Sequence, residues 1–315
     1  MHTLLEQPQS LGDPFRDLFH KCTHSVRVGD QEIRYTLMQA ENSSDPTVYF
    51  LPGLGLSYTT YKGFLESLYN KGKSFFAAEN VEIDQFGSKN KLKGEEKLQN
   101  AKKELAKWKK EKCVFSDAQV KRAIGSIEML ENLAIPQPID VIAHSAGAVS
   151  AVLAATLRPE LFRKIFLYAP AGMIEGDDPL RLKTASINFG VLLKSKLRQL
   201  GMMPGGEHDK SFLPSAEIDY EMFGMQQTMR GDLGAEAQID EVAVTYVAPM
   251  VRALIEKGVR VSAGIGDKDH LYPSDLLGPA LKENKVPYFV IEGVGHYALG
   301  TRATVVDRVM KVLSE

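Results

Sequence analysis

The chain has 315 residues, enough for one large domain or for a core domain that carries an insertion. Its composition, 44% hydrophobic and 25% charged, is ordinary for a soluble globular protein, and 38 Lys and Arg against 40 Asp and Glu leave no positive field for nucleic acid. The chain has only two cysteines, which argues against a disulfide framework. Its polar N-terminus argues against a signal peptide, and no apolar run reaches the roughly 18 residues of a transmembrane segment. We therefore expect a cytoplasmic protein.

The chain begins with a segment that reads as an N-terminal arm, residues 1–20, with one short helix near residues 13–20. Next come two short runs of alternating apolar and polar residues, 25–28 and 33–36. Because the dipeptide Gly29-Asp30 separates them, they predict a β-hairpin.

Buried strands then alternate with amphipathic helices. This alternation predicts a mostly parallel sheet with helices on both faces, and therefore the α/β class. The predicted strands are residues 47–51, 74–83, 139–142, 164–168, 259–265 and 288–291. The predicted helices are residues 58–71, 117–133, 148–157 and 301–313.

The alternation stops after residue 170 and resumes near residue 259. We therefore divide the chain into a core, residues 21–170 and 246–315, and an inserted helical cap, residues 171–245. The cap region has no clear strands and is rich in methionine, a flexible side chain that adapts to irregular apolar ligands. These methionines are Met173, Met202, Met203, Met222, Met225 and Met229.

A second insertion, residues 89–112, carries ten lysines. Leu98, Ala101, Leu105 and Trp108 are spaced three, four and three residues apart, which puts them on one face of a helix. We expect a solvated helix that lies over the core by this apolar stripe. The alternative is a basic surface for anionic lipid or an acidic protein, although four glutamates dilute the charge.

The most informative motif is the pentapeptide Ala143-His144-Ser145-Ala146-Gly147. It follows a buried strand and precedes a helix, and its small residues allow the chain to turn sharply. A serine at such a turn is held where its hydroxyl can attack a carbonyl, as in the nucleophile elbow G-x-S-x-G. Ala143 stands here in place of the first glycine.

A serine nucleophile needs a base oriented by an acid, and both residue types follow later predicted strands. One strand ends in Gly266-Asp267-Lys268-Asp269, and the next ends in Glu292-Gly293-Val294-Gly295-His296. The carboxyl ends of parallel strands meet at one edge of an open sheet, so these loops and the elbow are expected to lie together.

With these motifs the chain resembles the α/β-hydrolase superfamily over roughly residues 25–315. The matching pieces also include Leu51-Pro52-Gly53-Leu54-Gly55 and Asp84-Gln85-Phe86-Gly87-Ser88, the second with an architectural role. The elbow is similar to the A-H-S-x-G form of some bacterial lipases. Pro52 replaces the histidine that is usual in the oxyanion loop.

The resemblance implies a role for each matched residue. Ser145 would be the nucleophile, His296 the general base, and Asp269 the acid, with Asp267 as the main rival and Glu292 a poor third. The backbone N–H groups of Leu54 and Ala146 would hold the oxyanion. The resemblance further implies that Gly53, Gly55, His144 and Met173 lie at the substrate site; His144 is expected to pack beside the elbow, and His270 to have no chemical role.

The sequence thus predicts a serine esterase, a lipase-like carboxylesterase that cleaves a moderately apolar small-molecule ester without a cofactor or metal. One alternative is a C–C bond hydrolase of aromatic degradation, with Arg181, Arg198 or Arg230 as polar groups in the cap. Another is a non-catalytic binding or scaffold protein that keeps the fold. A serine at the elbow, rather than an aspartate, argues against epoxide and haloalkane chemistry.

Overall fold

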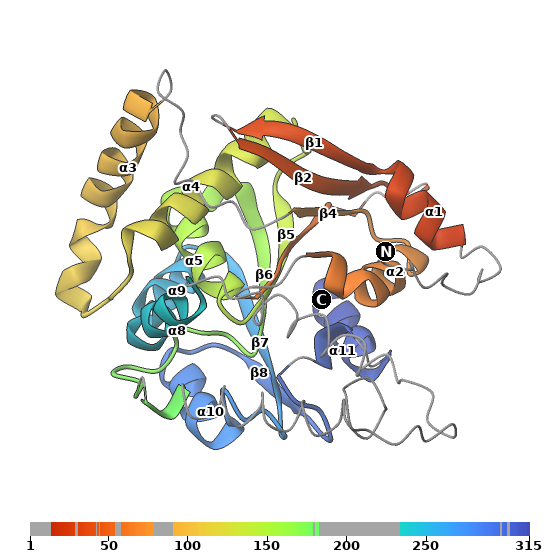
Figure 1. The fold of residues 1–315 in the computed structure, drawn as a ribbon. Helices are drawn as coiled ribbons and strands as arrows, with labels where there is room; N and C mark the ends of the chain where they lie inside the picture. The colour runs from red at the N-terminus through yellow and green to blue at the C-terminus, as the bar shows by residue number, and fades with distance from the viewer. Residues whose placement is uncertain are drawn as a thin grey trace, which may run out of the picture.

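The structure of the protein, a computed structural model, describes residues 14–28, 31–41, 43, 45–53, 58–78, 91–178, 180–182, 234–296, 298–300 and 303–315. Within these ranges the chain forms an eight-stranded sheet flanked by helices (Figure 1). The strand order is β1-β2-β4-β3-β5-β6-β7-β8. The first two strands form an antiparallel hairpin, β2 pairs antiparallel with β4, and every later pair is parallel.

The hairpin consists of β1 (Thr23–Val28) and β2 (Gln31–Met38), as predicted, and its turn lies outside the described residues. The parallel strands are β3 (Val48–Leu51), β4 (Phe75–Ala78), β5 (Ile139–His144), β6 (Phe162–Tyr168), β7 (Arg260–Gly266) and β8 (Tyr288–Ile291). Strands β3, β4 and β5 are buried along their whole length, which explains their nearly continuous apolar sequences.

Helices cover both faces of the sheet, and each face has its own apolar core (Figure 1). One face carries α1 (Pro14–Lys21), η1 (Tyr58–Tyr61), α2 (Lys62–Asn70), η4 (Ala298–Gly300) and α11 (Ala303–Ser314). The other carries α3 (Lys91–Leu105), η2 (Ala106–Glu111), α4 (Asp117–Asn132), α5 (Gly147–Leu157), η3 (Pro159–Leu161), α8 (Gly234–Val244), α9 (Ala248–Glu256) and α10 (Ser274–Glu283). The predicted mostly parallel sheet with helices on both faces is confirmed.

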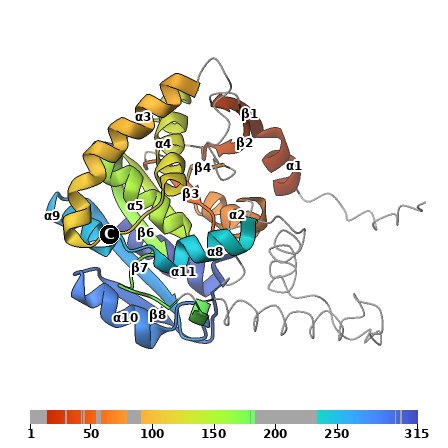
Figure 2. The same cartoon turned by 60° about the vertical axis from the view of Figure 1, so that its left-hand side comes forward.

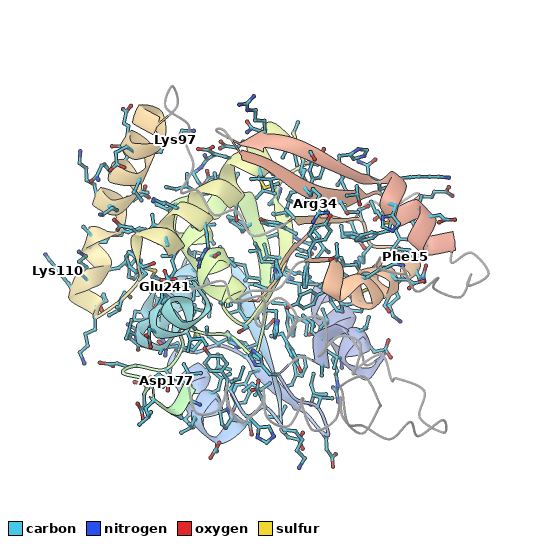
Figure 3. All side chains as sticks on the ribbon, in the orientation of Figure 1. Phe15, Arg34, Lys97, Lys110, Asp177 and Glu241 are labelled. Atoms are coloured by element: carbon cyan, nitrogen blue, oxygen red, sulfur yellow. The ribbon has the colours of Figure 1, made fainter. Side chains whose placement is uncertain are left out.

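The basic insertion lies along the outside of α4 (Figure 2). Leu98, Ala101 and Leu105 of α3 are buried in the core, and Trp108 of η2 is half-buried against it. The side chain of Lys110 lies at the outer edge of the molecule (Figure 3). This arrangement supports the interpretation of the segment as a solvated helix held by its apolar stripe.

Two details go beyond the sequence-based expectations. Helix α1, which falls in the predicted N-terminal arm, packs on the sheet, because Phe15 and Phe19 are buried in the core of its face. Helices α9 and α10 were not predicted. Strand β4 is described only to Ala78, and the remainder of that predicted strand lies outside the described residues, as does the turn 84–88.

Most of the predicted cap, residues 171–245, also lies outside the described residues. The described parts are residues 171–178, 180–182 and 234–245, which include α8. The helical cap therefore stays a prediction. Among the helices that the structure describes, none is both long enough and apolar enough to cross a bilayer.

Candidate active site

Ser145 lies at the sharp turn between β5 and α5 and has a φ of +52°. This value falls in the left-handed region of backbone conformations, which few residues other than glycine adopt. Such a conformation costs about 1–3 kcal/mol and persists only where the surroundings impose it. Here the Ser145 N–H donates to the Tyr168 carbonyl at 3.0 Å, and the Ser145 carbonyl accepts from the Ala171 N–H at 3.1 Å. The backbone of the elbow is thus tied to the end of β6 and the residues after it.

Two glycines let the chain pack closely around the serine. A Cβ on Gly147 would lie 2.5 Å from the Pro52 carbonyl oxygen. A Cβ on Gly53 would lie 2.9 Å from Nδ1 of His144 and 3.3 Å from Cβ of Ser145. Because the end of β3 touches the elbow this closely, the predicted oxyanion loop begins beside the predicted nucleophile.

The loops after β7 and β8 bring Asp269 and His296 together. Oδ2 of Asp269 lies 2.8 Å from Nδ1 of His296, and both side chains are buried. Oδ1 of Asp269 accepts the backbone N–H groups of Leu271 at 2.8 Å and Tyr272 at 2.9 Å. The carboxylate is therefore fixed by three contacts, and it fixes the imidazole in turn.

The other acids near this loop have different surroundings. Oδ1 of Asp267 accepts the backbone N–H of Val294 at 3.2 Å, so this carboxylate ties the β7 loop to the β8 loop. The side chains of Glu292 and His270 are exposed. The geometry thus favours Asp269 over Asp267 as the partner of His296, as the resemblance implies.

His144 is completely buried beside the elbow, as expected from the sequence. Its Nδ1 lies 2.5 Å from the Tyr61 hydroxyl and its Nε2 lies 2.9 Å from the backbone carbonyl of His296. Burial, and then the neighbouring His296, hold the pKa of His144 well below its usual range. With both ring nitrogens engaged in the protein, His144 is not placed to contact a substrate, so the structure does not support its assignment to the substrate site.

The remaining predicted site residues are only partly described. Ala146 lies at the N-terminus of α5, where backbone N–H groups and the helix dipole favour negative charge. Leu54 and Gly55 lie outside the described residues. Met173, at the start of the predicted cap, is buried in the core. Its contact with a substrate stays a prediction.

Three tyrosines around His144 and His296 were not predicted from the sequence. The Tyr168 hydroxyl donates to the Gly295 carbonyl at 3.0 Å, and the ring of Tyr272 lies 5.6 Å from that of His296. Tyr168 ends β6 and Tyr272 follows Asp269 by three residues, so the rule about carboxyl ends of strands could have found both. Tyr61, on η1, carried no such signal.

The described residues include no group of three or more His, Cys, Asp or Glu side chains placed to hold a metal ion. The carboxyl ends of the strands thus carry a strained serine after β5 and a hydrogen-bonded Asp–His pair in the loops after β7 and β8. Such an arrangement can supply a nucleophile, a general base and an acid that orients the base.

The sequence matches no family model and no curated protein, whereas many solved structures match the fold. One is a carboxylesterase structure from the thaumarchaeon Nitrososphaera gargenis, with a TM-score of 0.60 and 13% identity over 92% of this chain and 98% of that chain. A second is the enol-lactonase from Burkholderia xenovorans, with a TM-score of 0.60 and 13% identity over 93% of this chain and 100% of that chain. A third is a serine hydrolase involved in carbazole degradation, with a TM-score of 0.58 and 14% identity over 93% of this chain and 98% of that chain. The chain has the α/β-hydrolase fold.

Proposed function

We propose that the protein is a serine hydrolase that cleaves a carboxylic ester through Ser145, His296 and Asp269. The observation that carries this proposal is the conjunction of two features at one edge of the sheet. Ser145 is held in the left-handed conformation of a nucleophile elbow, and the Asp269–His296 pair is buried in the loops after β7 and β8, where the His296 carbonyl oxygen lies 2.9 Å from Nε2 of His144, the residue before Ser145. A protein that only binds a ligand has no need for either feature.

The proposed reaction has two steps. Oγ of Ser145 attacks the ester carbonyl and passes its proton to Nε2 of His296, the ring nitrogen opposite the one that faces Asp269. His296 then gives that proton to the leaving alcohol as the C–O bond breaks, which leaves an acyl-enzyme. Water attacks the acyl-enzyme with the same proton movements, releases the carboxylic acid and restores Ser145.

The oxyanion of both steps would be held by the backbone N–H groups of Ala146 and Leu54. Ala146 directly follows the nucleophile at the N-terminus of α5, which supports its part in this assignment. Removal of a single oxyanion donor typically lowers kcat by about 100-fold to 1,000-fold, and backbone donors cannot be removed by side-chain substitution.

The proposed substrate is an ester with a moderately apolar acyl or alcohol group, and the protein is proposed to act in the cytoplasm. The substrate class rests on the methionine-rich sequence of the predicted cap. The C–C hydrolase alternative gains no support from Arg181, the described member of its arginine set. Its guanidinium pairs with Asp177 through two hydrogen bonds and donates a third to the Leu271 carbonyl, so it holds a loop rather than a substrate.

The first test is the intact mass of the protein after exposure to a fluorophosphonate. Wild type is expected to gain one adduct, and Ser145→Ala is expected to gain none. Ser150→Ala is the matched control, because Ser150 is a buried serine on the same helix α5. An adduct that survives in Ser145→Ala, or folded wild type that gains none, contradicts the proposal; the second outcome favours a non-catalytic protein.

Turnover of nitrophenyl esters with different acyl chains tests the substrate class. Ser145→Ala is expected to lower kcat by about 10⁴-fold to 10⁶-fold, as removal of the nucleophile does in serine hydrolases. Wild type is expected to prefer medium apolar acyl groups to short charged ones. The opposite preference would refute the proposed substrate class while leaving the nucleophile in place.

A further inference from the structure

A chain of hydrogen bonds runs through His144, the residue before Ser145, in the candidate active site. The Gly53 N–H donates to the Tyr61 hydroxyl at 3.1 Å. The Tyr61 oxygen lies 2.5 Å from Nδ1 of His144, and Nε2 of His144 lies 2.9 Å from the His296 carbonyl oxygen. These contacts join the end of β3, η1, the end of β5 and the loop that carries His296.

The chemistry of the two ends fixes the direction of every bond in this chain. A carbonyl oxygen can only accept, so Nε2 of His144 carries a proton and donates it to His296. Burial keeps His144 neutral, so its Nδ1 is unprotonated and accepts. The Tyr61 hydroxyl therefore donates to Nδ1, and its oxygen accepts the Gly53 N–H.

We propose that Tyr61 and His144 act as positioning residues that hold the His296 backbone and the Gly53 backbone in register around Ser145. This pair of side chains, the Tyr61–His144 relay, is proposed to act through the backbone groups that it holds, and the His144 ring also packs against the His296 ring, with centroids 4.8 Å apart. The inference rests on the proposed function and deepens it. It explains why a buried histidine with both nitrogens engaged precedes the nucleophile, a feature that the Ser–His–Asp arrangement does not require.

The relay connects the two parts of the site that must be placed most accurately. At one end it fixes the residue whose imidazole moves the proton. At the other end it fixes Gly53, the residue before Leu54, whose N–H is proposed to hold the oxyanion. Because a displacement of about 1 Å in such groups can cost 100-fold in rate, loss of the relay is expected to lower kcat rather than to raise KM.

Two substitutions of His144 separate the ends of the relay. In His144→Gln the side-chain amide can reach the position of Nε2 and donate to the His296 carbonyl. In His144→Asn the shorter amide reaches only the position of Nδ1, where it can accept from Tyr61. We expect kcat to fall about 10-fold to 100-fold in His144→Asn and less than fivefold in His144→Gln, with KM within twofold in both.

The Tyr61 end has its own matched pair. Tyr61→Phe removes the hydroxyl that bridges Gly53 and His144, and we expect kcat to fall about 10-fold. Tyr58→Phe is the control, because Tyr58 is also buried on η1 and its hydroxyl accepts from Thr36 at 3.1 Å. This control is expected to keep kcat within twofold. Equal losses in the two variants would point to a general effect of a lost buried hydroxyl and would overturn the relay.

A measurement that does not depend on turnover is the tautomer of His144, read from nitrogen-15 NMR of the histidine side chains. The relay requires the Nε2–H tautomer in wild type and in Tyr61→Phe; an Nδ1–H tautomer in wild type overturns it. Folding of each variant is checked by thermal unfolding. Wild type that fails to react with the fluorophosphonate overturns the proposed function and with it the catalytic role of the relay. Reactive wild type with equal kcat in His144→Gln and His144→Asn overturns the relay alone.

Discussion

Asp267 and Asp269 follow β7 two residues apart, and their hydrogen bonds predict opposite results for the same substitution. Asp269→Asn replaces the carboxylate that orients Nδ1 of His296, and we expect kcat to fall about 10³-fold to 10⁴-fold. In Asp267→Asn the amide oxygen can still accept the Val294 N–H, so we expect less than a fivefold change. Steady-state kinetics of both variants on one ester checks this. A larger loss in Asp267→Asn would assign the acid to Asp267.

The burial of His144 also predicts how stability depends on pH. The pKa of His144 is depressed in the folded protein, so the unfolded chain binds a proton that the folded chain does not. The stabilisation is fully present above the unfolded pKa of about 6.5 and is lost at about 1.4 kcal/mol per pH unit as the pH falls below it.

Urea unfolding between pH 8 and pH 5 measures this contribution. The free energy of unfolding of wild type is expected to fall more steeply below pH 6.5 than that of His144→Gln, which has no imidazole at this position. Equal slopes in the two proteins would show that His144 is protonated in the folded state and would contradict the assigned direction of its hydrogen bonds.

At the scale of elements, α3 tests whether the basic insertion is held by its apolar stripe. Leu105 is completely buried, so Leu105→Ala is expected to lower the free energy of unfolding by about 2–4 kcal/mol. Lys103 lies on the exposed side of the same helix, and Lys103→Ala is expected to change it by less than about 0.5 kcal/mol. Urea unfolding of the two variants checks both values. Similar small effects would mean that α3 contributes little to the core.

Some helices could be predicted from the sequence and others could not. Helix α4 was predicted to within one residue because its apolar positions recur at helical spacing, and the structure adds a capping box of Ser116 and Gln119 at its start. Helix α10 was missed because Gly278 and Pro279 in its middle read as a break. Helix α9 is short and directly follows the predicted cap, so no boundary in the sequence separated it.

The candidate site shows a similar division. Asp269 and His296 could be paired from sequence because each follows a parallel strand, and the carboxyl ends of such strands share one edge. Tyr61 could not be found in this way. It is 83 residues from His144 and lies on the 3₁₀-helix η1, so only tertiary packing brings its hydroxyl to Nδ1 of His144.

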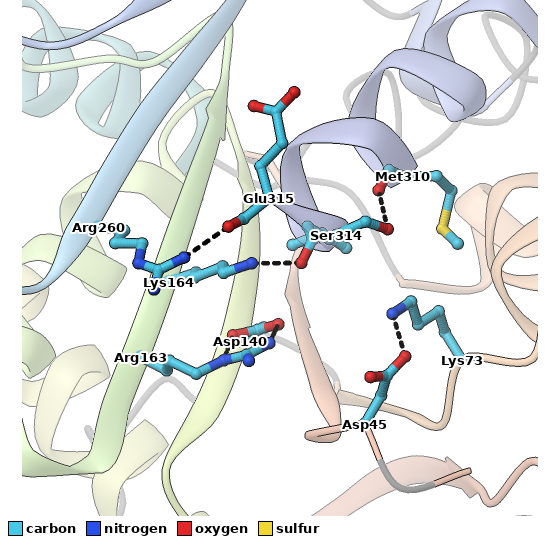
Figure 4. A network of polar contacts seen from close by, with 10 residues as sticks. Asp45, Lys73, Asp140, Arg163, Lys164, Arg260, Met310, Ser314 and Glu315 are labelled. Atoms are coloured by element: carbon cyan, nitrogen blue, oxygen red, sulfur yellow. Dashed lines mark hydrogen bonds and ion pairs between the residues drawn. The ribbon is translucent and has the colours of Figure 1, made fainter.

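In the molecule as a whole, the carboxyl ends and the amino ends of the parallel strands carry different kinds of polar contact. The candidate site occupies the carboxyl ends of the strands, whereas ion pairs and hydrogen bonds gather at the amino ends (Figure 4). There Arg163 forks onto Asp140 with contacts of 2.8 and 2.5 Å, and Lys73 pairs with Asp45. Lys164 and Arg260 donate to backbone carbonyls at the C-terminal end of α11 and the residue after it. The amino-end network thus ties β5, β6 and β7 to one another and to the last helix.

This separation predicts that stability and catalysis can be disrupted independently. The Asp140 carboxylate is buried while Arg163 is about one-third exposed, so Asp140→Asn is expected to lower the free energy of unfolding by about 2 kcal/mol, a value reduced for solvent screening. Because Asp140 lies at the opposite edge from Ser145, kcat/KM at 25 °C is expected to stay within twofold. Asp269→Asn is expected to affect catalysis more than stability, with a large loss of kcat. Urea unfolding of both variants measures the free energy of unfolding, and ester turnover measures kcat/KM. A parallel loss of activity in Asp140→Asn would mean that the amino-end network transmits strain to the elbow through β5.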